Sequence, residues 1–262
     1  MIEIAQVQNL LWAANAVVGA ILTALLVLRK NYRLYLAFFS YVLLIDVQNI
    51  LFFMTYRRWG FNSLIAWRIA WLTLGVLICA RALAVAEVCR HLLARYRGVW
   101  ALAWRLLSAC AVLVLICSLI IGKHQWNLAV HSASRGLDLA IAAFIAGLFL
   151  FIKFYDVKTD STARLLAVGF FLYSCFGVLN NTFLEHWLDR YSSLWNLLGL
   201  LAFLFSLFLW TRALRLPRTV PTREKVLLPE TVYSTMGSEI NLRLHLLNES
   251  LNQLWNAGAP RP

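Results

Sequence analysis

The sequence predicts an all-α protein: a bundle of seven transmembrane helices followed by a short tail. Hydrophobic residues make up 61% of the 262-residue chain and charged residues only 14%, and the mean hydropathy is +0.71. Soluble domains are about half apolar and about a quarter charged, so this composition favours a membrane protein. The apolar stretches are continuous and about 20 residues long, as membrane-spanning helices require, whereas transmembrane barrel strands alternate over about 10 residues.

Seven such stretches lie between charged connections. They predict spans at 10–28, 34–56, 64–86, 100–121, 133–152, 163–184 and 193–213. The first stretch follows MIEIAQVQ, which has no basic residue, and no cleavage site comes after it, so we interpret it as a retained span. We therefore expect a transmembrane domain over residues 1–214 and a cytoplasmic tail over residues 215–262.

The distribution of Lys and Arg predicts the direction of the spans. The first, third and fifth connections and the segment after the last span are rich in basic residues, and the even connections are poorer. Because cytoplasmic loops carry the excess of positive charge, we expect the C-terminus in the cytoplasm and the N-terminus outside. The net charge of +12 then reflects membrane orientation, and we expect no nucleic-acid partner.

The tail combines a basic, proline-containing linker with a short amphipathic helix predicted over residues 238–256. Leucines recur there at mixed helical spacings, at Leu242, Leu244, Leu247, Leu251 and Leu254. A helix this short is marginally stable alone. We therefore expect it to pack against its own membrane domain, the membrane surface or a partner protein.

Polar side chains gather in the predicted outer half of the membrane. The candidate binding residues are Asp46, Asn49, Arg68, Arg135, Asp138, Asn180 and Asn196. A charge near mid-membrane costs about 2.5 kcal/mol or more, so we expect Asp46 to pair with Arg68. Arg135 is expected to pair with Asp138 or with a neighbouring helix. The cluster predicts either a ligand pocket or polar contacts that only hold the helices together.

A second charged set is predicted at the cytoplasmic ends of the third and fourth spans. It contains Arg81, Glu87, Arg90, His91 and Arg105. Glu87 lies three residues from Arg90 and four from His91, spacings that place side chains on one helix face. The set predicts a cytoplasmic salt-bridge network, or a switch that links the outer pocket to the cytoplasmic face.

Motifs of catalytic and metal sites are missing from the sequence. HExxH, GxSxG, the P-loop and GxGxxG do not occur, and the histidines are scattered. The last span contains no lysine that could carry retinal. We therefore expect no catalytic residue, no metal and no cofactor.

The runs YLAFFSYVLLID, EVCRHLLARYRG and SASRGLDLAIAAFIAGLFLF resemble a group of uncharacterised bacterial seven-helix integral membrane proteins. The resemblance implies residence in the bacterial cytoplasmic (inner) membrane and brings no established activity. The layout is also similar to the seven-transmembrane sensor modules of bacterial signalling proteins. Those usually precede a kinase or cyclase domain, for which this tail is too short, so any output would pass to a separate protein.

Three functions stay open at this point. The first is a receptor-like or sensor-like binding protein with an outward-facing pocket for a small polar or zwitterionic ligand, signalling through a cytoplasmic partner. The second is a non-catalytic accessory or structural subunit of a larger membrane complex. The third is a small-solute transporter or an intramembrane enzyme.

Overall fold

The structure is a computed structural model of the chain. It describes residues 2–60, 63–93, 97–121, 126–155, 157, 159–187, 192–215 and 237–257. The elements within these ranges are all helical: eight α-helices and one short 3-10 helix. Their bounds are α1 Ile2–Leu28, η1 Asn31–Arg33, α2 Leu36–Trp59, α3 Leu64–Leu92, α4 Arg97–Ile121, α5 Trp126–Phe154, α6 Ser161–Trp187, α7 Ser192–Arg215 and α8 Gly237–Ala257.

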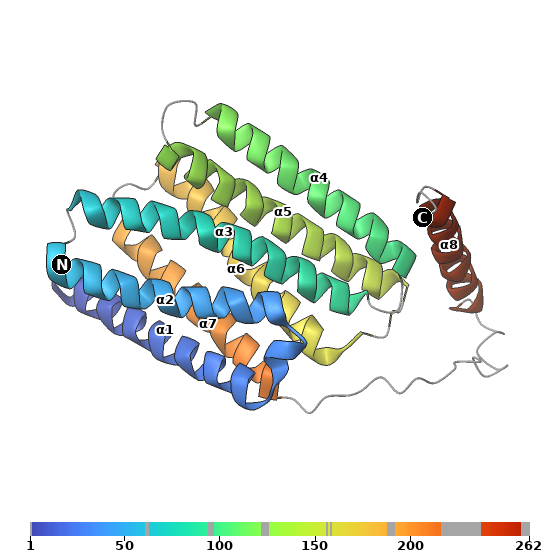
Figure 1. Ribbon diagram of the computed structural model, residues 1–262, viewed down its shortest axis with the longest axis horizontal. Helices are drawn as coiled ribbons and strands as arrows, with labels where there is room; N and C mark the ends of the chain where they lie inside the picture. Colours follow the sequence, from blue (N-terminus) through green and yellow to red (C-terminus); the bar gives the residue numbers. More distant parts are fainter. Residues whose placement is uncertain are drawn as a thin grey trace.

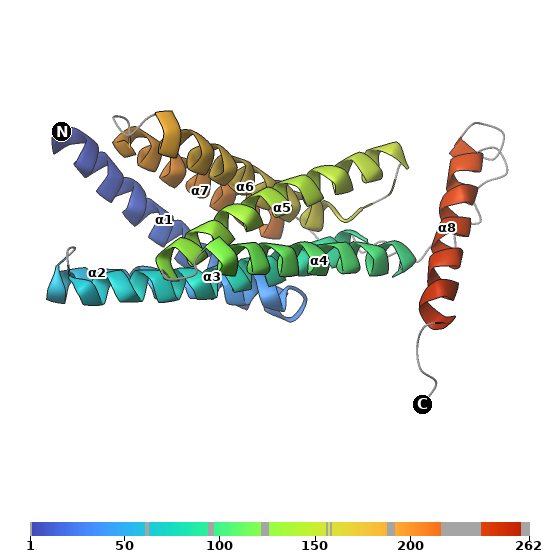
Figure 2. The same cartoon turned by 90° about the horizontal axis from the view of Figure 1, so that it is seen from above.

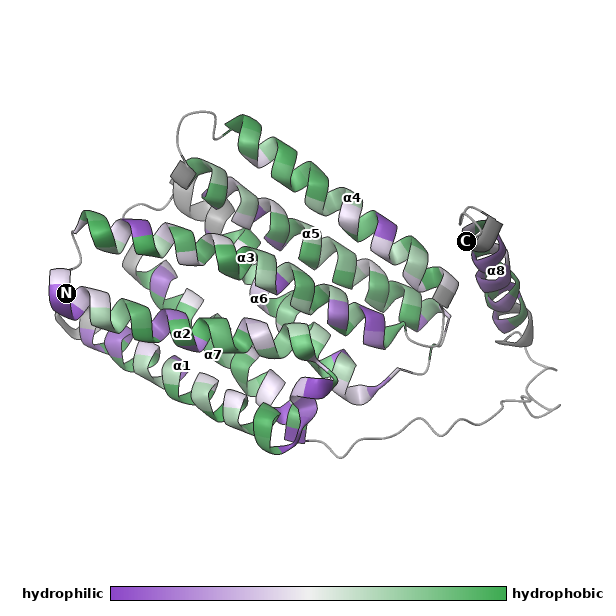
Figure 3. Ribbon diagram, viewed as in Figure 1, coloured by the Kyte–Doolittle hydropathy of each residue, from purple (hydrophilic) through white to green (hydrophobic). Residues whose placement is uncertain are grey.

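Helices α1 to α7 are long and apolar enough to cross a membrane, which confirms the seven predicted spans and identifies an integral membrane protein. Figure 3 shows hydrophobic residues along most of their length. Several helices run past the predicted spans: α3 continues to Leu92 and α5 begins at Trp126. The predicted third span ends before α3 does because Glu87 and Arg90 are charged and yet are good helix formers. The direction of the chain stays a prediction from the charge pattern.

Six of the spans form a closed ring, in the order α1, α2, α3, α5, α6, α7 and back to α1. Helix α3 also contacts α6 across the ring. Helix α4 lies outside the ring and packs mainly on α5. Its side chains are accordingly exposed along most of its length, as Leu113 at 62% and Ile120 at 61% illustrate.

An aromatic cluster fills the ring toward the end where α2 and α6 begin. Phe38, Phe170 and Trp210 are fully buried. The Trp210 ring centroid lies 5.4 Å from that of Phe38 and 4.8 Å from that of Phe170. The indole Nε1 donates to the Leu166 carbonyl at 3.1 Å. Gly169 lets the indole pack directly on the α6 backbone, because a Cβ there would overlap the ring.

The side chain of Arg29, in the loop after α1, binds free backbone carbonyls at this same end of the bundle. Arg29 Nη1 donates to the carbonyls of Leu214 and Arg215, each at 2.9 Å. These are among the last carbonyls of α7, which have no partner within the helix. The guanidinium also brings positive charge to the negative end of the α7 dipole. The loop after α1 therefore caps the last turn of α7.

Helix α8 lies across the end of the bundle next to the start of α4 (Figure 1, Figure 2). The Gly98 amide donates to Asn248 Oδ1 at 2.9 Å, and Leu244 is buried. The Arg105 guanidinium lies 4.3 Å from the centroid of the Trp255 ring. Three surfaces were expected to hold the tail helix. In the structure α8 packs on one of them, the membrane domain of the same chain. The basic linker, residues 216–236, lies outside the described residues.

Candidate functional site

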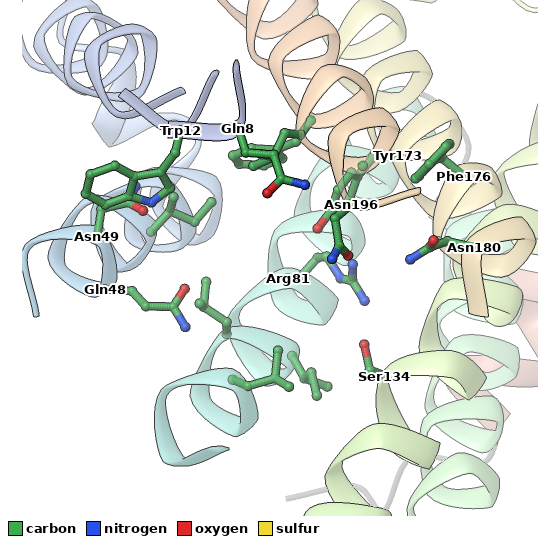
Figure 4. Close-up of a pocket in the computed structure, with 18 of the residues that line it drawn as sticks. Gln8, Trp12, Gln48, Asn49, Arg81, Ser134, Tyr173, Phe176, Asn180 and Asn196 are labelled. Atoms are coloured by element: carbon green, nitrogen blue, oxygen red, sulfur yellow. The ribbon is translucent and has the colours of Figure 1, made fainter. Parts of the chain in front are cut away.

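A cavity of about 940 Å³ enters the ring from the end where α1, α3, α5 and α7 begin (Figure 4). All six ring helices line it, and α4, outside the ring, contributes no lining residue. The size is within the range of about 300–1,000 Å³ that is typical of small-molecule sites. Its walls are largely apolar and aromatic, with Trp12, Phe53, Phe176, Trp195 and Phe203 among the lining residues.

Amide side chains from several helices meet around this cavity. They are Gln8, Asn9, Gln48, Asn49, Asn180 and Asn196. Gln48 Nε2 donates to Thr73 Oγ1 at 2.9 Å, a bond that sets the register of α2 against α3. In Figure 4 the side chains of Ser134, Asn180 and Asn196 lie around the guanidinium of Arg81.

A buried ion pair forms the floor of the cavity. Arg81 Nη2 lies 2.9 Å from Asp138 Oδ1, and the two side chains are 7% and 6% exposed. The pair joins α3 to α5, and it is the one ion pair found between the side chains that the structure describes. The ring of Tyr173, with its centroid 5.6 Å from Arg81 Cζ, adds a cation–π contact from α6. Three ring helices therefore converge on one guanidinium.

Gly177 on α6 leaves room for the Asp138 carboxylate. A Cβ at Gly177 would lie 2.7 Å from Asp138 Oδ2, closer than real Cβ contacts allow. Ser174, one turn earlier on α6, is fully buried. Gly177 on α6 thus leaves open backbone opposite the acid on α5.

Four buried polar atoms of cavity-lining residues have no hydrogen-bond partner within the described part of the chain: Arg81 Nε, Arg81 Nη2, Asp138 Oδ1 and Asn180 Oδ1. Arg81 Nη2 and Asp138 Oδ1 are the two atoms that form the ion pair, so Arg81 Nε and Asn180 Oδ1 are left without any partner among the described residues. Buried polar groups in proteins are hydrogen-bonded in the great majority of cases. One donor and one acceptor with unused hydrogen-bonding capacity therefore belong to residues that line the cavity.

Of the seven predicted binding residues, Asn49, Asp138, Asn180 and Asn196 line the cavity. Asp46, Arg68 and Arg135 are not among its lining residues. Arg68 is exposed near the start of α3, and Arg135 is half-buried near the start of α5. Asp138 pairs with Arg81 on a neighbouring helix, and not with Arg135 on its own.

Asp46 turns toward α1 and away from the cavity. Its Oδ2 accepts a hydrogen bond from Thr23 Oγ1 at 2.6 Å, and its Oδ1 occupies the space that a Cβ at Gly19 would fill. The predicted partner, Arg68, was wrong because the two residues differ in depth. At 1.5 Å per residue, Asp46 lies about 20 Å from the end of α2, whereas Arg68 lies about 6 Å from the adjacent start of α3.

The predicted cytoplasmic set separates into different places in the structure. Arg81 belongs to the cavity. Glu87 Oε2 accepts from the Phe38 amide at 2.9 Å, and His91 Nε2 lies 3.0 Å from the Leu34 carbonyl, so both hold the start of α2. Arg90 is exposed, and Arg105 contacts α8. The five residues do not form one network, because Glu87 and Arg105 have partners on α2 and α8, and His91 binds Leu34, just before α2.

Sequence reasoning placed Arg81 near the end of the third span because it ended that span at residue 86. The helix continues to Leu92, so Arg81 lies deeper in the bundle than that boundary implied. One signal for its role is present in the sequence. Leu74, Leu77, Ile78 and Arg81 recur at spacings of three, one and three, which place them on one face of α3, and all four line the cavity.

A scan against protein-family models and searches of curated proteins and of solved structures found no match to this chain. The described residues also contain no group of three or more His, Cys, Asp or Glu side chains that could hold a metal ion. The function is therefore argued from the geometry of the cavity.

Proposed function

We propose that the protein is a receptor-like membrane binding protein whose cavity takes up a small polar molecule. The observation that carries the proposal is the ion pair of Arg81 and Asp138 at the floor of a cavity of about 940 Å³. Binding sites for small molecules combine apolar walls with a few converging polar groups, as this cavity does. With the orientation predicted from the loop charges, the cavity opens to the outside of the cell.

The closed far side of the cavity supports binding over transport. Tyr41 lines the cavity, and the fully buried rings of Phe38, Phe170 and Trp210 follow one layer deeper. The Tyr41 ring centroid lies 5.8 Å from that of Phe170 and 6.1 Å from that of Trp210. A transporter would have to move these rings apart to release its substrate, whereas a receptor needs only the pocket above them.

A chain of packed helices connects the cavity to the tail and supports an output through α8. Helix α5 carries Asp138, α4 packs on α5, and α8 packs on α4. A ligand that changes the Arg81–Asp138 contact would act directly on α5. Signalling further requires that the ligand prefers one of two arrangements of these helices. Exposed leucines on α8, Leu242, Leu246 and Leu254, offer contact area to a separate protein.

A thermal-shift screen of polar metabolites on the purified protein in lipid nanodiscs tests the proposal. We expect a ligand to raise the melting temperature of the wild type and not that of Asn196→Trp, which places an indole among the cavity-lining groups. Leu113→Trp, on the exposed face of α4, is the matched control and should respond like the wild type. A ligand that shifts all three proteins equally would contradict binding in the cavity.

A second candidate function, an accessory subunit of a membrane complex, is favoured by one observation. Helix α4 lies outside the ring. Only 6% of its most apolar 18-residue stretch is buried, the lowest share among the seven spans found in the described residues. A partner subunit would cover this face. Cross-linking in native membranes from Leu113→Cys tests this candidate: a product of fixed mass supports the subunit function, and labelling by lipid analogues alone argues against it.

A further inference from the structure

We propose that the cavity binds an organic acid whose carboxylate is received by the free side of the Arg81 guanidinium. This inference rests on the proposed binding function and names the chemical class of its ligand. It follows from the charges of the lining, the unused donors of Arg81 and the apolar walls above it.

Among the described side chains that line the cavity, the charged ones are Arg57, Arg81 and Asp138, so positive charge is in excess there. Arg57 is exposed at the mouth, and Arg81 is buried at the floor. An acid therefore meets a guanidinium both where it enters and where it comes to rest. An amine would meet the same two cations and would have to compete with Arg81 for Asp138.

The Arg81 guanidinium has N–H donors that its contact with Asp138 does not use. It carries five N–H groups in a rigid fork, and its contact with Asp138 is made through Nη2. Nε has no hydrogen-bond partner among the described residues, although the side chain is only 7% exposed. Carboxylates bind such a fork through two parallel hydrogen bonds. Arg81 can therefore receive a second carboxylate without releasing Asp138.

Asp138 has a defined part in this arrangement. It holds the guanidinium in place, and its own negative charge opposes a second carboxylate nearby. Asp138→Asn should therefore bind the acid more tightly, while Arg81→Gln should lose it. If the ion pair only stabilised the bundle, the pattern would differ. Removing either charge would then weaken both the fold and any ligand binding.

The other lining residues indicate the chemical nature of the rest of the ligand. Trp12, Phe53, Phe176 and Trp195 give it aromatic walls between the mouth and the floor. Amide groups, including Asn49 and Asn196, are the polar contacts along the way. The lining therefore suits an acid with an apolar or aromatic body, and it suits a compact inorganic anion less well.

The test uses the full chain in nanodiscs of phosphatidylcholine, which carries no net charge. Dissociation constants are measured for 4-phenylbutanoate, for its primary amide and its amine analogue, and for inorganic phosphate. The variants are Arg81→Gln, Asp138→Asn and the neutral double variant Arg81→Gln/Asp138→Asn, which keeps side chains of similar shape if a single change unfolds the protein. Arg90→Gln is the matched control, on the same helix but exposed and outside the lining.

We expect the wild type and Arg90→Gln to bind the carboxylate about tenfold or more tightly than the amide, because hydrogen bonds to charged groups are stronger. This preference should rise in Asp138→Asn and disappear in both variants that lack Arg81. Equal binding of acid, amide and amine by the wild type would overturn the inference and leave the proposed binding function standing. Binding of none of the four probes would count against both, and tightest binding of phosphate would replace the organic acid by an inorganic one.

Discussion

Arg81 and Asp138 meet between α3 and α5 with both side chains almost fully buried. Each charge is tolerated there because the other is within ion-pair distance, and because Gly177 leaves room for the carboxylate. Asp46 is tolerated by a different local solution, in which Thr23 donates a hydrogen bond and Gly19 leaves space on α1. At the scale of single residues, each deep acid is therefore matched to a small or polar residue on the next helix.

The first prediction concerns the ion pair. Arg81→Leu or Asp138→Leu alone should lower the free energy of unfolding by about 3 kcal/mol, since each leaves an uncompensated buried charge. The double variant should lose less than the sum, with a coupling energy of about 0.5–3 kcal/mol. Reversible unfolding in mixed micelles measures all four proteins of the cycle. Strict additivity of the two single changes would contradict the pairing.

The second prediction concerns the partner of Asp46. Thr23→Val should destabilise the protein by about 0.6–1.7 kcal/mol, the range of interhelical hydrogen bonds in membranes. Arg68→Gln, a change at an exposed side chain, should stay within about 0.5 kcal/mol of the wild type. In double-mutant cycles Asp46→Ala should couple to Thr23→Val and add independently to Arg68→Gln. Coupling to Arg68 in place of Thr23 would show that the contact is assigned wrongly.

At the scale of helices, glycines decide where two elements come close. Gly177 on α6 faces Asp138, and Gly98 on α4 faces the backbone of α8. Gly75 on α3 has nothing within 4 Å of the position its Cβ would take. The same residue type is therefore a requirement of packing at two of these positions and replaceable at the third.

This difference gives the third prediction. Gly75→Ala should raise the free energy of unfolding by about 0.4–1 kcal/mol, because alanine restricts the unfolded chain and favours the helix. Gly177→Ala should lower it, since the new methyl group would overlap the Asp138 carboxylate. Thermal unfolding of both variants beside the wild type measures the sign of each change. Stabilisation by Gly177→Ala would mean that the carboxylate does not occupy this space.

The fourth prediction concerns the docking of α8. A Cβ at Gly98 would lie 2.7 Å from the Asn248 carbonyl oxygen, so Gly98→Val should separate α8 from α4. Hydrogen exchange of α8 amides should become faster in this variant. Leu242→Gln, at a side chain that is 57% exposed, is the control and should leave the exchange unchanged. Unchanged exchange in Gly98→Val would argue that α8 is held elsewhere.

The sequence predicted the helices well and their partners poorly. Apolar length is a property of each segment by itself, so the seven spans and the tail helix were predicted close to their observed bounds. The pairing of Asp46, the position of Arg81 and the exclusion of α4 from the ring depend on how helices are arranged and on their register. A register is set by contacts such as Gln48 with Thr73, which join residues distant in the chain.

At the scale of the whole molecule, six helices enclose a cavity that one end of the bundle leaves open and the aromatic cluster closes at the other. The residues at the two ends differ in a way that matters for function. Arg57 lies at the open end, and Arg90 lies near the end of α3 on the opposite side of the bundle. The loop charges predict that the open end faces the outside of the cell.

The fifth prediction tests this orientation. In a cysteine-free background, Arg57→Cys should react with a membrane-impermeant thiol reagent added to intact cells. Arg90→Cys, also exposed, should react only after the membrane is permeabilised. The reverse pattern would place the open end of the cavity in the cytoplasm. The ligand would then have to come from the cytoplasm and not from outside the cell.

Native mass spectrometry of the protein released gently from its own membrane tests directly whether the cavity holds a small molecule. We expect a bound small mass on the wild type that is lost in Asn196→Trp and in the double variant Arg81→Gln/Asp138→Asn, and retained in Leu113→Trp. Accurate mass and fragmentation would also show whether the molecule carries a carboxylate. A wild-type protein that carries only a second protein chain in fixed ratio, with no small mass, would contradict the binding function and favour the accessory subunit.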